Sequence, residues 1–263
     1  MATTPFGMKF GKLPPEYDER TIQFSKHMDP NFHAPTQFDF DKGRTPFEIQ
    51  DWGASRYKTD VIAAQANQLL RMGRIDQRRT IPIESQDVIR RYKNLAGVKK
   101  LGDQHDVGVT MLEAFRAWRR GWMIRKRPYR LAMFGEIEPL ERDLIRTLIY
   151  VFRGCHFGLW LPNAVVGEIH RWEWNGENGE NWKPGSAGGI AAYCKAYTPT
   201  HYELIVDGFL IWASNEFIEK FSDECWVAVE TLDYWSHQIL DIRSLFMLHP
   251  SLAVELGEKG GTA

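Results

Sequence analysis

Few residues of this chain have the types and spacing that enzyme chemistry requires. Phosphate-binding (G-x-x-x-x-G-K-[ST]), dinucleotide-binding (G-x-G-x-x-G), redox (C-x-x-C) and zinc-protease (H-E-x-x-H) patterns are absent. Ser186 lies among glycines, but Pro184 takes the place of the first glycine in the nucleophile elbow G-x-S-x-G. We therefore do not expect Ser186 to be a nucleophile.

Thiol and imidazole chemistry is suggested by the adjacent residues Cys155 and His156. Neighbouring side chains of a strand point to opposite faces, so these two cannot pair with each other. Cys155, Cys194 and Cys225 all fall in apolar, strand-like runs, where buried structural cysteine is the usual outcome. Three cysteines are too few for a disulfide framework, and no spacing indicates a zinc site. We expect no metal and no cofactor.

A basic stretch carries six positive charges in twelve residues, with Trp122 and Tyr129 interleaved. Its members are Arg119, Arg120, Arg125, Lys126, Arg127 and Arg130. One interpretation is an anion or nucleic-acid surface. The other, which we favour, is the solvated end of a helix whose last-turn cations suit the helix dipole.

Composition and charge exclude several classes of protein. The chain has 263 residues, 43% of them apolar, which is enough for a hydrophobic core. Lys and Arg number 33 against 34 Asp and Glu, which argues against a generally basic, nucleic-acid-coating surface and leaves room for a local patch. No apolar run reaches the roughly 18 residues of a membrane span, and residues 1–11 lack a signal-peptide core. We expect no membrane partner and a reducing compartment.

The predicted secondary structure that must position any site changes from helices to mainly strands near Gly154. Helices are predicted from Thr59 to about residue 70, then over residues 85–96, 110–120 and 139–154, the last opened by Pro139. Strands are predicted over residues 155–161, 190–197, 201–206, 209–212 and 226–229, with a short helix over 215–221. A helical front half followed by a mainly β back half predicts an α+β fold with two lobes.

Four regions follow from this reading of the chain. They are an extended N-terminal arm (1–50), a helical lobe (51–154), a β lobe (155–235) and a C-terminal tail (236–263). The arm is rich in proline and glycine, with one short helix predicted over residues 21–28, and it contains Phe24, Phe32, Phe38, Phe40 and Phe47. It either is a disordered leader or wraps its own domain or a partner. We expect it to serve assembly rather than the domain core.

Four segments, in order, resemble a bacterial and bacteriophage branch of the papain-like cysteine hydrolases. Residues 12–21 (KLPPEYDERT) are similar to the leader K-L-P-x-x-x-D-x-R-T, and residues 52–64 (WGASRYKTDVIAA) to the nucleophile segment W-G…R-Y-G-D-C-x-I-A-A. Residues 184–191 (PGSAGGIA) are similar to the histidine segment P-G-S-W-G-G-H-A, and residues 223–229 (DECWVAV) to the strand D-E-A-Y-A-V. The resemblance spans about residues 12–235 and implies a helical lobe, with a central helix, packed on an antiparallel β lobe.

The catalytic residues that the resemblance implies are missing from this chain. Asp60 stands at the place of the nucleophilic cysteine, and Ile190 at that of the histidine. Ala54 replaces the oxyanion-side Gln or Asn, the orienting position falls near Ile205, and Asp207 replaces a tryptophan. Every role of a catalytic triad is therefore empty. We expect Asp60 to be a capping or fold residue, held ionised by the positive end of its helix.

We therefore interpret the chain as a catalytically inactive papain-like domain used as a structural or binding module in a bacteriophage head, neck or tail. Its expected location is the virion if a phage encodes it and the cytoplasm otherwise, with other subunits of a homo- or hetero-oligomer as partners. The alternative is an active hydrolase or transferase with a relocated nucleophile, Cys155 or Cys194. A third interpretation is ligand binding in the old cleft, with Trp52, Gly188 and Gly189 as candidates and a tryptophan cluster at 172, 174 and 182.

Overall fold

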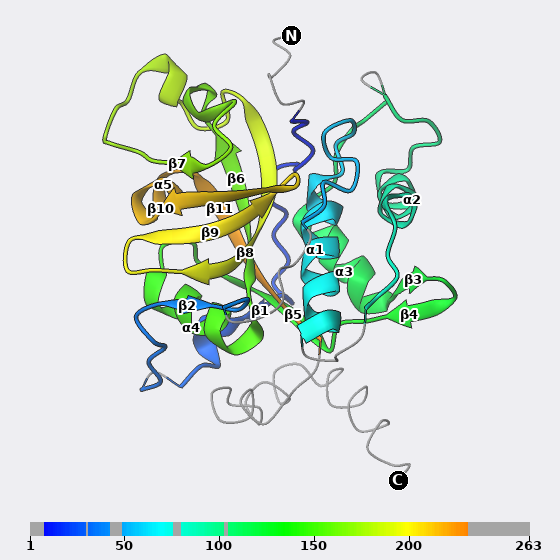
Figure 1. The fold of residues 1–263 in the computed structure, drawn as a ribbon, viewed down its shortest axis with the longest axis horizontal. Helices are drawn as coiled ribbons and strands as arrows, with labels where there is room; N and C mark the ends of the chain where they lie inside the picture. Colours follow the sequence, from blue (N-terminus) through cyan, green and yellow to red (C-terminus); the bar gives the residue numbers. More distant parts are fainter. Residues whose placement is uncertain (1–7, 30, 43–48, 76–79, 103–104, 231–263) are drawn as a thin grey trace.

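The computed structural model describes residues 8–29, 31–42, 49–75, 80–102 and 105–230 (Figure 1). Its helices are α1 (Asp60–Ile75), α2 (Ser85–Ala96), α3 (Met111–Arg120), α4 (Arg142–Phe152) and α5 (Asn215–Phe221). None of the helices among these residues is long and apolar enough to cross a membrane.

A nine-stranded sheet forms the centre of the molecule, in the order β1-β5-β11-β6-β8-β9-β10-β7, with β2 also pairing with β8. Its strands are β1 (Ile22–Gln23), β2 (Phe38–Asp39), β5 (Met133–Ile137), β6 (Cys155–Leu161), β7 (Arg171–Trp172), β8 (Gly188–Tyr197), β9 (His201–Val206), β10 (Phe209–Ser214) and β11 (Ser222–Val229). Pairing is antiparallel except for β1 with β5 and β7 with β10. A separate hairpin joins β3 (Trp122–Ile124) and β4 (Arg127–Tyr129).

Alternation along the central strands divides their side chains between two hydrophobic clusters. In β6, Cys155, Phe157 and Leu159 face a sheet-lobe cluster that is closed by α4 and α5. The intervening His156 faces the other side and packs against Phe115 of α3. On that side, buried residues of α1, α2 and α3 form an interlobe cluster with the sheet. The two-lobe α+β fold predicted from the sequence is thus confirmed.

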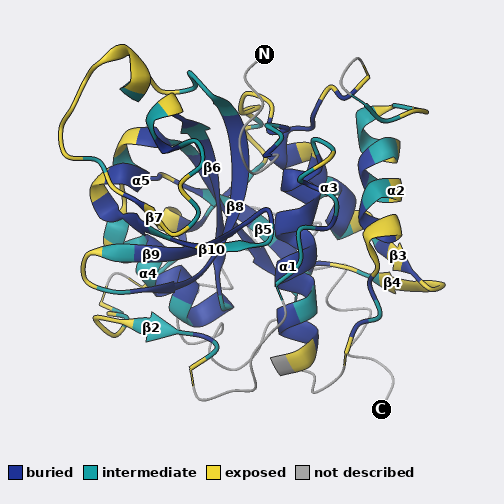
Figure 2. Cartoon of the chain, turned by 45° about the horizontal axis from the view of Figure 1, so that its top comes forward, coloured by how far each residue is buried: buried dark blue, intermediate teal, exposed yellow. Residues whose placement is uncertain are grey.

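Helix α1 lies at the centre because its first turns carry small and aliphatic side chains. Val61, Ile62, Ala63, Ala64 and Ala66 are all buried, and small side chains let the helix approach the sheet closely. Figure 2 shows α1 buried along most of its length beside the sheet. The prediction of a buried central helix here is confirmed.

The lobes are not continuous in the sequence. Residues 133–152, which the sequence assigned to the helical lobe, form β5 and α4, and both belong to the sheet-lobe cluster. Helix α4 also begins later than expected, at Arg142, so Pro139 does not occupy its first turn. The five-residue strand Met133–Ile137 lacked turn signals that would mark it off from the basic stretch before it. The expected tail 236–263 lies outside the described residues.

The described part of the arm packs on its own chain. Met8, Ile22 and Phe24 are buried in the sheet-lobe cluster, and the ring of Phe24 lies 5.7 Å from that of Phe152. Residues 8–29 and 31–42 are therefore bound into the domain, and the expectation that the arm does not belong to the core is wrong for them. Residues 1–7 and Phe47 lie outside the described residues.

Two local predictions in the first half of the chain are also wrong. Residues 21–28 form strand β1 and a single 3-10 turn, Phe24–Lys26, because Ile22 pairs with Gly135 of β5 instead of continuing a helix. The basic stretch is not the end of one helix: Gly121 ends α3, and the chain then turns through the β3–β4 hairpin.

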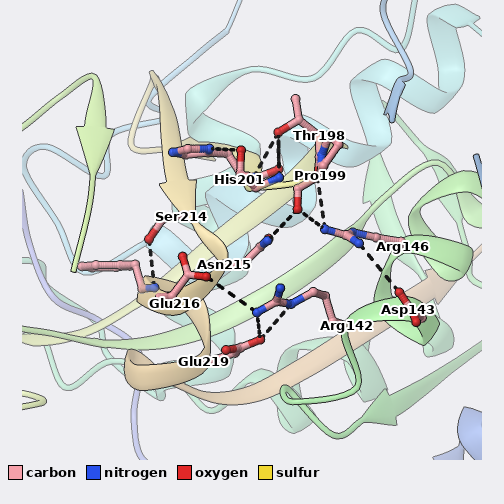
Figure 3. Close-up of polar contacts among 12 residues, drawn as sticks. Arg142, Asp143, Arg146, Thr198, Pro199, His201, Ser214, Asn215, Glu216 and Glu219 are labelled. Atoms are coloured by element: carbon pink, nitrogen blue, oxygen red, sulfur yellow. Dashed lines mark hydrogen bonds and ion pairs between the residues drawn. The ribbon is translucent and has the colours of Figure 1, made fainter. Parts of the chain in front are cut away.

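A polar clamp fixes α4 and α5 to the turn between β8 and β9 (Figure 3). The Arg142 guanidinium of α4 donates to Glu219 of α5. Arg146 of α4 and Asn215 of α5 both donate to the carbonyl oxygen of Pro199, at 2.7 and 2.9 Å. This clamp closes the sheet-lobe cluster on the side away from α1.

Candidate functional site

The N-terminus of α1 points at strand β8, and this junction is where the resemblance puts the catalytic pair. Thr59 precedes the helix as expected of a cap, and its carbonyl oxygen accepts from the Ala63 N–H at 2.8 Å. Its buried Oγ1 has no hydrogen-bond partner among the described residues, so Thr59 does not cap through its side chain. The side chain that does make a hydrogen bond at this end of α1 is the carboxyl of Asp60.

Asp60 joins the two lobes. Its side chain is buried, and its Oδ2 accepts a hydrogen bond from the backbone N–H of Ala191 in β8 at 2.9 Å. Burial raises the pKa of Asp60 to about 7, although the Ala191 bond and the positive charge of Lys12 act against the rise. A pKa of about 7 means that Asp60 is mostly protonated below neutral pH, so the expectation that the helix dipole keeps it ionised is not met there.

A second buried carboxyl, that of Asp207, lies close enough to Asp60 for the two charges to interact. It is buried in the turn between β9 and β10 with a left-handed φ of 46°, and neither of its carboxylate oxygens has a partner among the described residues. Burial, and then the charges of Asp60 and Asp51, raise its pKa well above the ordinary value. Asp51 itself accepts from Gly53 N and Ser55 Oγ, so it serves the loop before α1.

The other positions matched to catalytic residues are apolar and packed. Ala54 and Ile205 are buried in the interlobe cluster. Ile190 packs into the sheet-lobe cluster, and it is its neighbour Ala191 that contacts Asp60. No group of three or more His, Cys, Asp or Glu side chains that could hold a metal occurs in the described ranges.

The junction between the lobes is filled by the chain's own residues 8–13. In Figure 1 this segment descends between the sheet and α1. Its backbone is hydrogen-bonded to both lobes. Lys12 N–H donates to Gly189 O of β8, and Leu13 N–H donates to Val109 O just before α3. Val109 N–H in turn donates to Gly11 O at 3.0 Å. The segment thus forms a strand-like bridge between the lobes.

Glycines on both sides make room for this close approach. A Cβ on Gly11 would overlap Asp60 Oδ1 and the Lys58 carbonyl oxygen. A Cβ on Gly189 would lie 2.5 Å from the carbonyl oxygen of Lys12, well inside contact distance. The backbone of residues 11 and 12 therefore occupies the space directly over Asp60.

Lys12 anchors the segment by a buried ion pair. Its side chain is fully buried, and its Nζ lies 2.8 Å from Asp223 Oδ2 and 2.9 Å from Glu224 Oε1. Glu224 is also fully buried, accepts from Trp226 Nε1 at 2.6 Å, and has its pKa raised by burial. An unpaired charge at this depth would be strongly unfavourable, so the pair fixes Lys12 in place.

Sequence reasoning missed the roles of Gly11, Lys12 and Glu224. Lys12 opens the segment that resembles the family leader, and Glu224 lies in the last matching segment. Because the two segments come from opposite ends of the resemblance, their pairing could not be read from either one alone.

The candidate nucleophiles lie in buried positions. Cys155, Cys194 and Cys225 are all buried, as predicted, and burial raises the pKa of the Cys155 thiol. The thiolate is the reactive form, so this environment opposes nucleophilic chemistry. His156 faces away from Cys155 and shares a hydrogen bond with Gln68 Oε1, and burial lowers its pKa to about 3.

Ser186 also has a structural partner. Its Oγ accepts a hydrogen bond from the backbone N–H of Asn163 at 2.8 Å.

The candidate binding residues do not form one surface. Trp52 is 2% exposed in the interlobe cluster, and Gly189 and Gly188 are covered by the arm, with Phe10 against Gly188. The tryptophans at 172, 174 and 182 pack on the sheet-lobe cluster instead. Ligand binding between the lobes would require the arm to leave.

No protein-family model and no curated protein matches the sequence. Its fold is nevertheless similar to solved structures. Xylellain, a cysteine protease from Xylella fastidiosa, is 14% identical with a TM-score of 0.65, over 88% of this chain and 98% of xylellain.

Two further structures are similar at lower identity. The Carica candamarcensis cysteine protease CMS1MS2, in complex with E-64, is 10% identical with a TM-score of 0.54, over 75% of this chain and 99% of that one. Procathepsin L 3 of Tenebrio molitor larval midgut is 8% identical with a TM-score of 0.57, over 82% and 75%. Together with the central helix and the sheet described above, these similarities identify the architecture of this chain as the papain-like cysteine protease fold.

Proposed function

We propose that this chain is a catalytically inactive papain-like domain that acts as a structural or binding module. The observation that carries the proposal is the junction over the α1 N-terminus, where Asp60 stands in place of a thiol and the backbone of Gly11 and Lys12 lies against it. An acyl-transfer site needs a nucleophile, a base and room for the reacting carbonyl. The position matched to the base holds the buried Ile190, which supplies no imidazole.

Catalysis at this junction would require Asp60 itself to work as the nucleophile. A carboxylate can do so, but Asp60 is 1% exposed and already accepts from Ala191 N–H. The interpretation of a fold residue that joins helix, sheet and arm accounts for both facts.

The proposed setting is a bacteriophage virion, in which the domain would contact other protein subunits. This rests on the resemblance of residues 12–21, 52–64, 184–191 and 223–229 to the bacterial and bacteriophage branch of the family. Density-gradient particles from cells that produce the phage would contain the chain in fixed copy number. Particles without it would refute the virion location and leave the inactive domain as a cytoplasmic one.

Thiol labelling tests the proposal against a relocated cysteine nucleophile. The native protein is incubated with E-64 and with iodoacetamide near pH 7, and the intact mass is measured, with unfolded protein as the control in which all three cysteines react. We expect labelling of the native chain no faster than its unfolding allows. Rapid addition of one E-64 per chain would overturn the proposal and identify the alternative enzyme.

A further inference from the structure

The β3–β4 hairpin carries a cluster of exposed cations, which we call the basic hairpin. Figures 1 and 2 show it projecting beside α2, on the side of the molecule away from the sheet, with an exposed tip. The name covers the hairpin and its two ends, and the exposed cations are Arg120 at the end of α3, Arg125, Lys126 and Arg127 in the hairpin, and Arg130 just after β4. No Asp or Glu occurs in the sequence between Glu113 and Glu136, so the hairpin has no acidic residue of its own.

The body of the protein neutralises little of this charge. Arg125 pairs with Glu84, which is itself exposed. The other four exposed cations of the hairpin make no ion pair with any carboxylate in the part of the chain that the structure describes. Beneath the hairpin, Arg91 of α2 stacks 4.6 Å from the centre of the Trp122 ring, and burial together with the charge of Arg120 lowers the pKa of Arg91 to about 9. Positive charge is therefore concentrated on this face.

The turn of the hairpin uses residues that its backbone disfavours. Ile124 pairs with Arg127, so the loop has two residues, Arg125 and Lys126, and both have positive φ (44° and 68°). This is the type I′ geometry, for which Asn-Gly is strongly preferred, and a non-glycine residue with a long side chain is strained there. Two cations kept at strained positions on a projecting tip point to a function for their charge.

The chemistry of the surface favours a phosphate backbone over a protein partner. Trp118 and Trp122 are buried, and Met123 is the one large apolar side chain exposed on the hairpin, so the aromatic anchors of a protein interface are missing from this described segment. Four of the five exposed cations are arginines, whose planar forks match phosphate oxygens. A two-stranded ribbon also has the width to enter the major groove of a duplex.

We propose that the basic hairpin binds the phosphodiester backbone of nucleic acid without sequence preference. This surface is separate from the junction over Asp60 and does not depend on the inactivity of the domain.

The first test measures binding of the full chain to a fluorescent duplex of about 30 base pairs and to a single strand of the same length, from about 50 to 200 mM salt. The variant R125Q/K126Q/R127Q is compared with K26Q/R74Q/K183Q, which removes three exposed cations elsewhere. We expect the hairpin variant to weaken binding about 10-fold or more and to lower the slope of log affinity against log salt by about 2 to 3. The control variant should change affinity less than about 2-fold.

Absence of DNA binding by the native chain at the lowest salt, or equal losses in the two variants, would overturn the proposal. Poly-glutamate of equal charge is the competitor that separates the partner classes. If poly-glutamate displaces DNA at equal charge concentration, the surface recognises negative charge alone, and the assignment to nucleic acid is wrong.

The second test uses the strain in the turn. R125N/K126G places the preferred residues in the same backbone, so its melting temperature should rise, by about 2 to 4 °C. Its affinity for DNA should nevertheless fall, because two cations are lost. A more stable variant with unchanged affinity would show that Arg125 and Lys126 do not bind, and would overturn the proposal independently of the first test.

Discussion

Asp60 shows how burial can outweigh the electrostatic field of a helix N-terminus. In this fold the positive end of α1 can stabilise an anion, but burial of Asp60 outweighs that effect and raises its pKa to about 7. Its hydrogen bond to Ala191 N–H, across the junction of the lobes, gives the carboxyl a structural role. Stability should therefore depend on pH through this group.

The first prediction is that D60N removes a pH dependence. The folded pKa lies above the ordinary value of 3.8, so between about pH 4 and 7 the folded state binds more protons than the unfolded state. Stability contributed by Asp60 is thus present at low pH and is lost as pH rises to 7, by about 4 kcal/mol for about three pKa units. The amide that replaces the carboxyl in D60N cannot titrate, and its oxygen can still accept from Ala191 N–H.

Urea unfolding of the native chain and of D60N between about pH 4 and 8 measures this difference. Asp143, whose side chain is 98% exposed, provides the control D143N, which should keep the native pH dependence. A D60N protein with the same pH slope as the native chain would contradict the assignment.

The second prediction concerns Lys12. K12M keeps the length of the side chain but leaves Glu224 and Asp223 without their cation, and Glu224 is fully buried. Loss of one partner of a buried pair should destabilise the fold by about 3 to 5 kcal/mol at pH 7. Because protonation removes the unpaired charge of Glu224, the loss should shrink at about pH 5.

The double variant K12M/E224Q provides the matched comparison by urea unfolding. It should recover part of the stability at neutral pH, because no buried carboxylate remains at position 224. A K12M protein that is as stable as the native chain would show that the arm is not anchored by this pair.

Among the elements, the bridging segment 8–13, which we call the strap, connects β8 with the loop before α3 and lies against the start of α1. The third prediction is that G11A disrupts the strap, since its Cβ would overlap Asp60 Oδ1 and the Lys58 carbonyl oxygen. We expect a loss of about 1 to 3 kcal/mol and faster proteolysis of the arm. G179A is the control, because its Cβ would meet no atom within 4 Å. Equal behaviour of the two variants would contradict the packing described here.

The sequence predicts those elements whose pattern is local. Strand β6, helix α2 and helix α5 lie where apolar periodicity and capping residues put them. The β3–β4 hairpin and β5 were missed because Arg125-Lys126 is an atypical turn and no glycine or proline cluster separates β5 from it. The strap over Asp60 was missed for a different reason, since it depends on contacts between residues that are far apart in sequence.

The resemblance matches Asp60 and Ile190 to the catalytic pair, and that assignment stays a prediction. Both side chains are buried. Local sequence could not show that Ala191, rather than Ile190, contacts Asp60, because this depends on which face of β8 meets α1. It also could not give the pKa of Asp60, which is set mainly by burial in the assembled molecule.

In the whole molecule, residues 8–13 fill the junction between the two lobes, at the place that the resemblance matches to the catalytic pair. The fourth prediction is that D60C/I190H does not hydrolyse peptides. Ala54 and Ile205, which the resemblance matches to the oxyanion and orienting positions, supply no polar side chain, and removal of one oxyanion donor costs about 3 to 4 kcal/mol of barrier. The arm also still covers position 60. Cleavage of a peptide substrate by this variant above buffer would show that less of the site has been lost.

The most direct test of inactivity is turnover by the native chain. A diverse peptide library is incubated with the intact protein at acidic, mildly acidic and neutral pH, and new termini are identified by mass spectrometry, with the D60N protein and a variant with Cys155, Cys194 and Cys225 changed to serine run in parallel. We predict no cleavage above buffer at any pH. Cleavage by the native chain that is lost in D60N or in the cysteine-free protein would contradict the account and show that this domain is an enzyme.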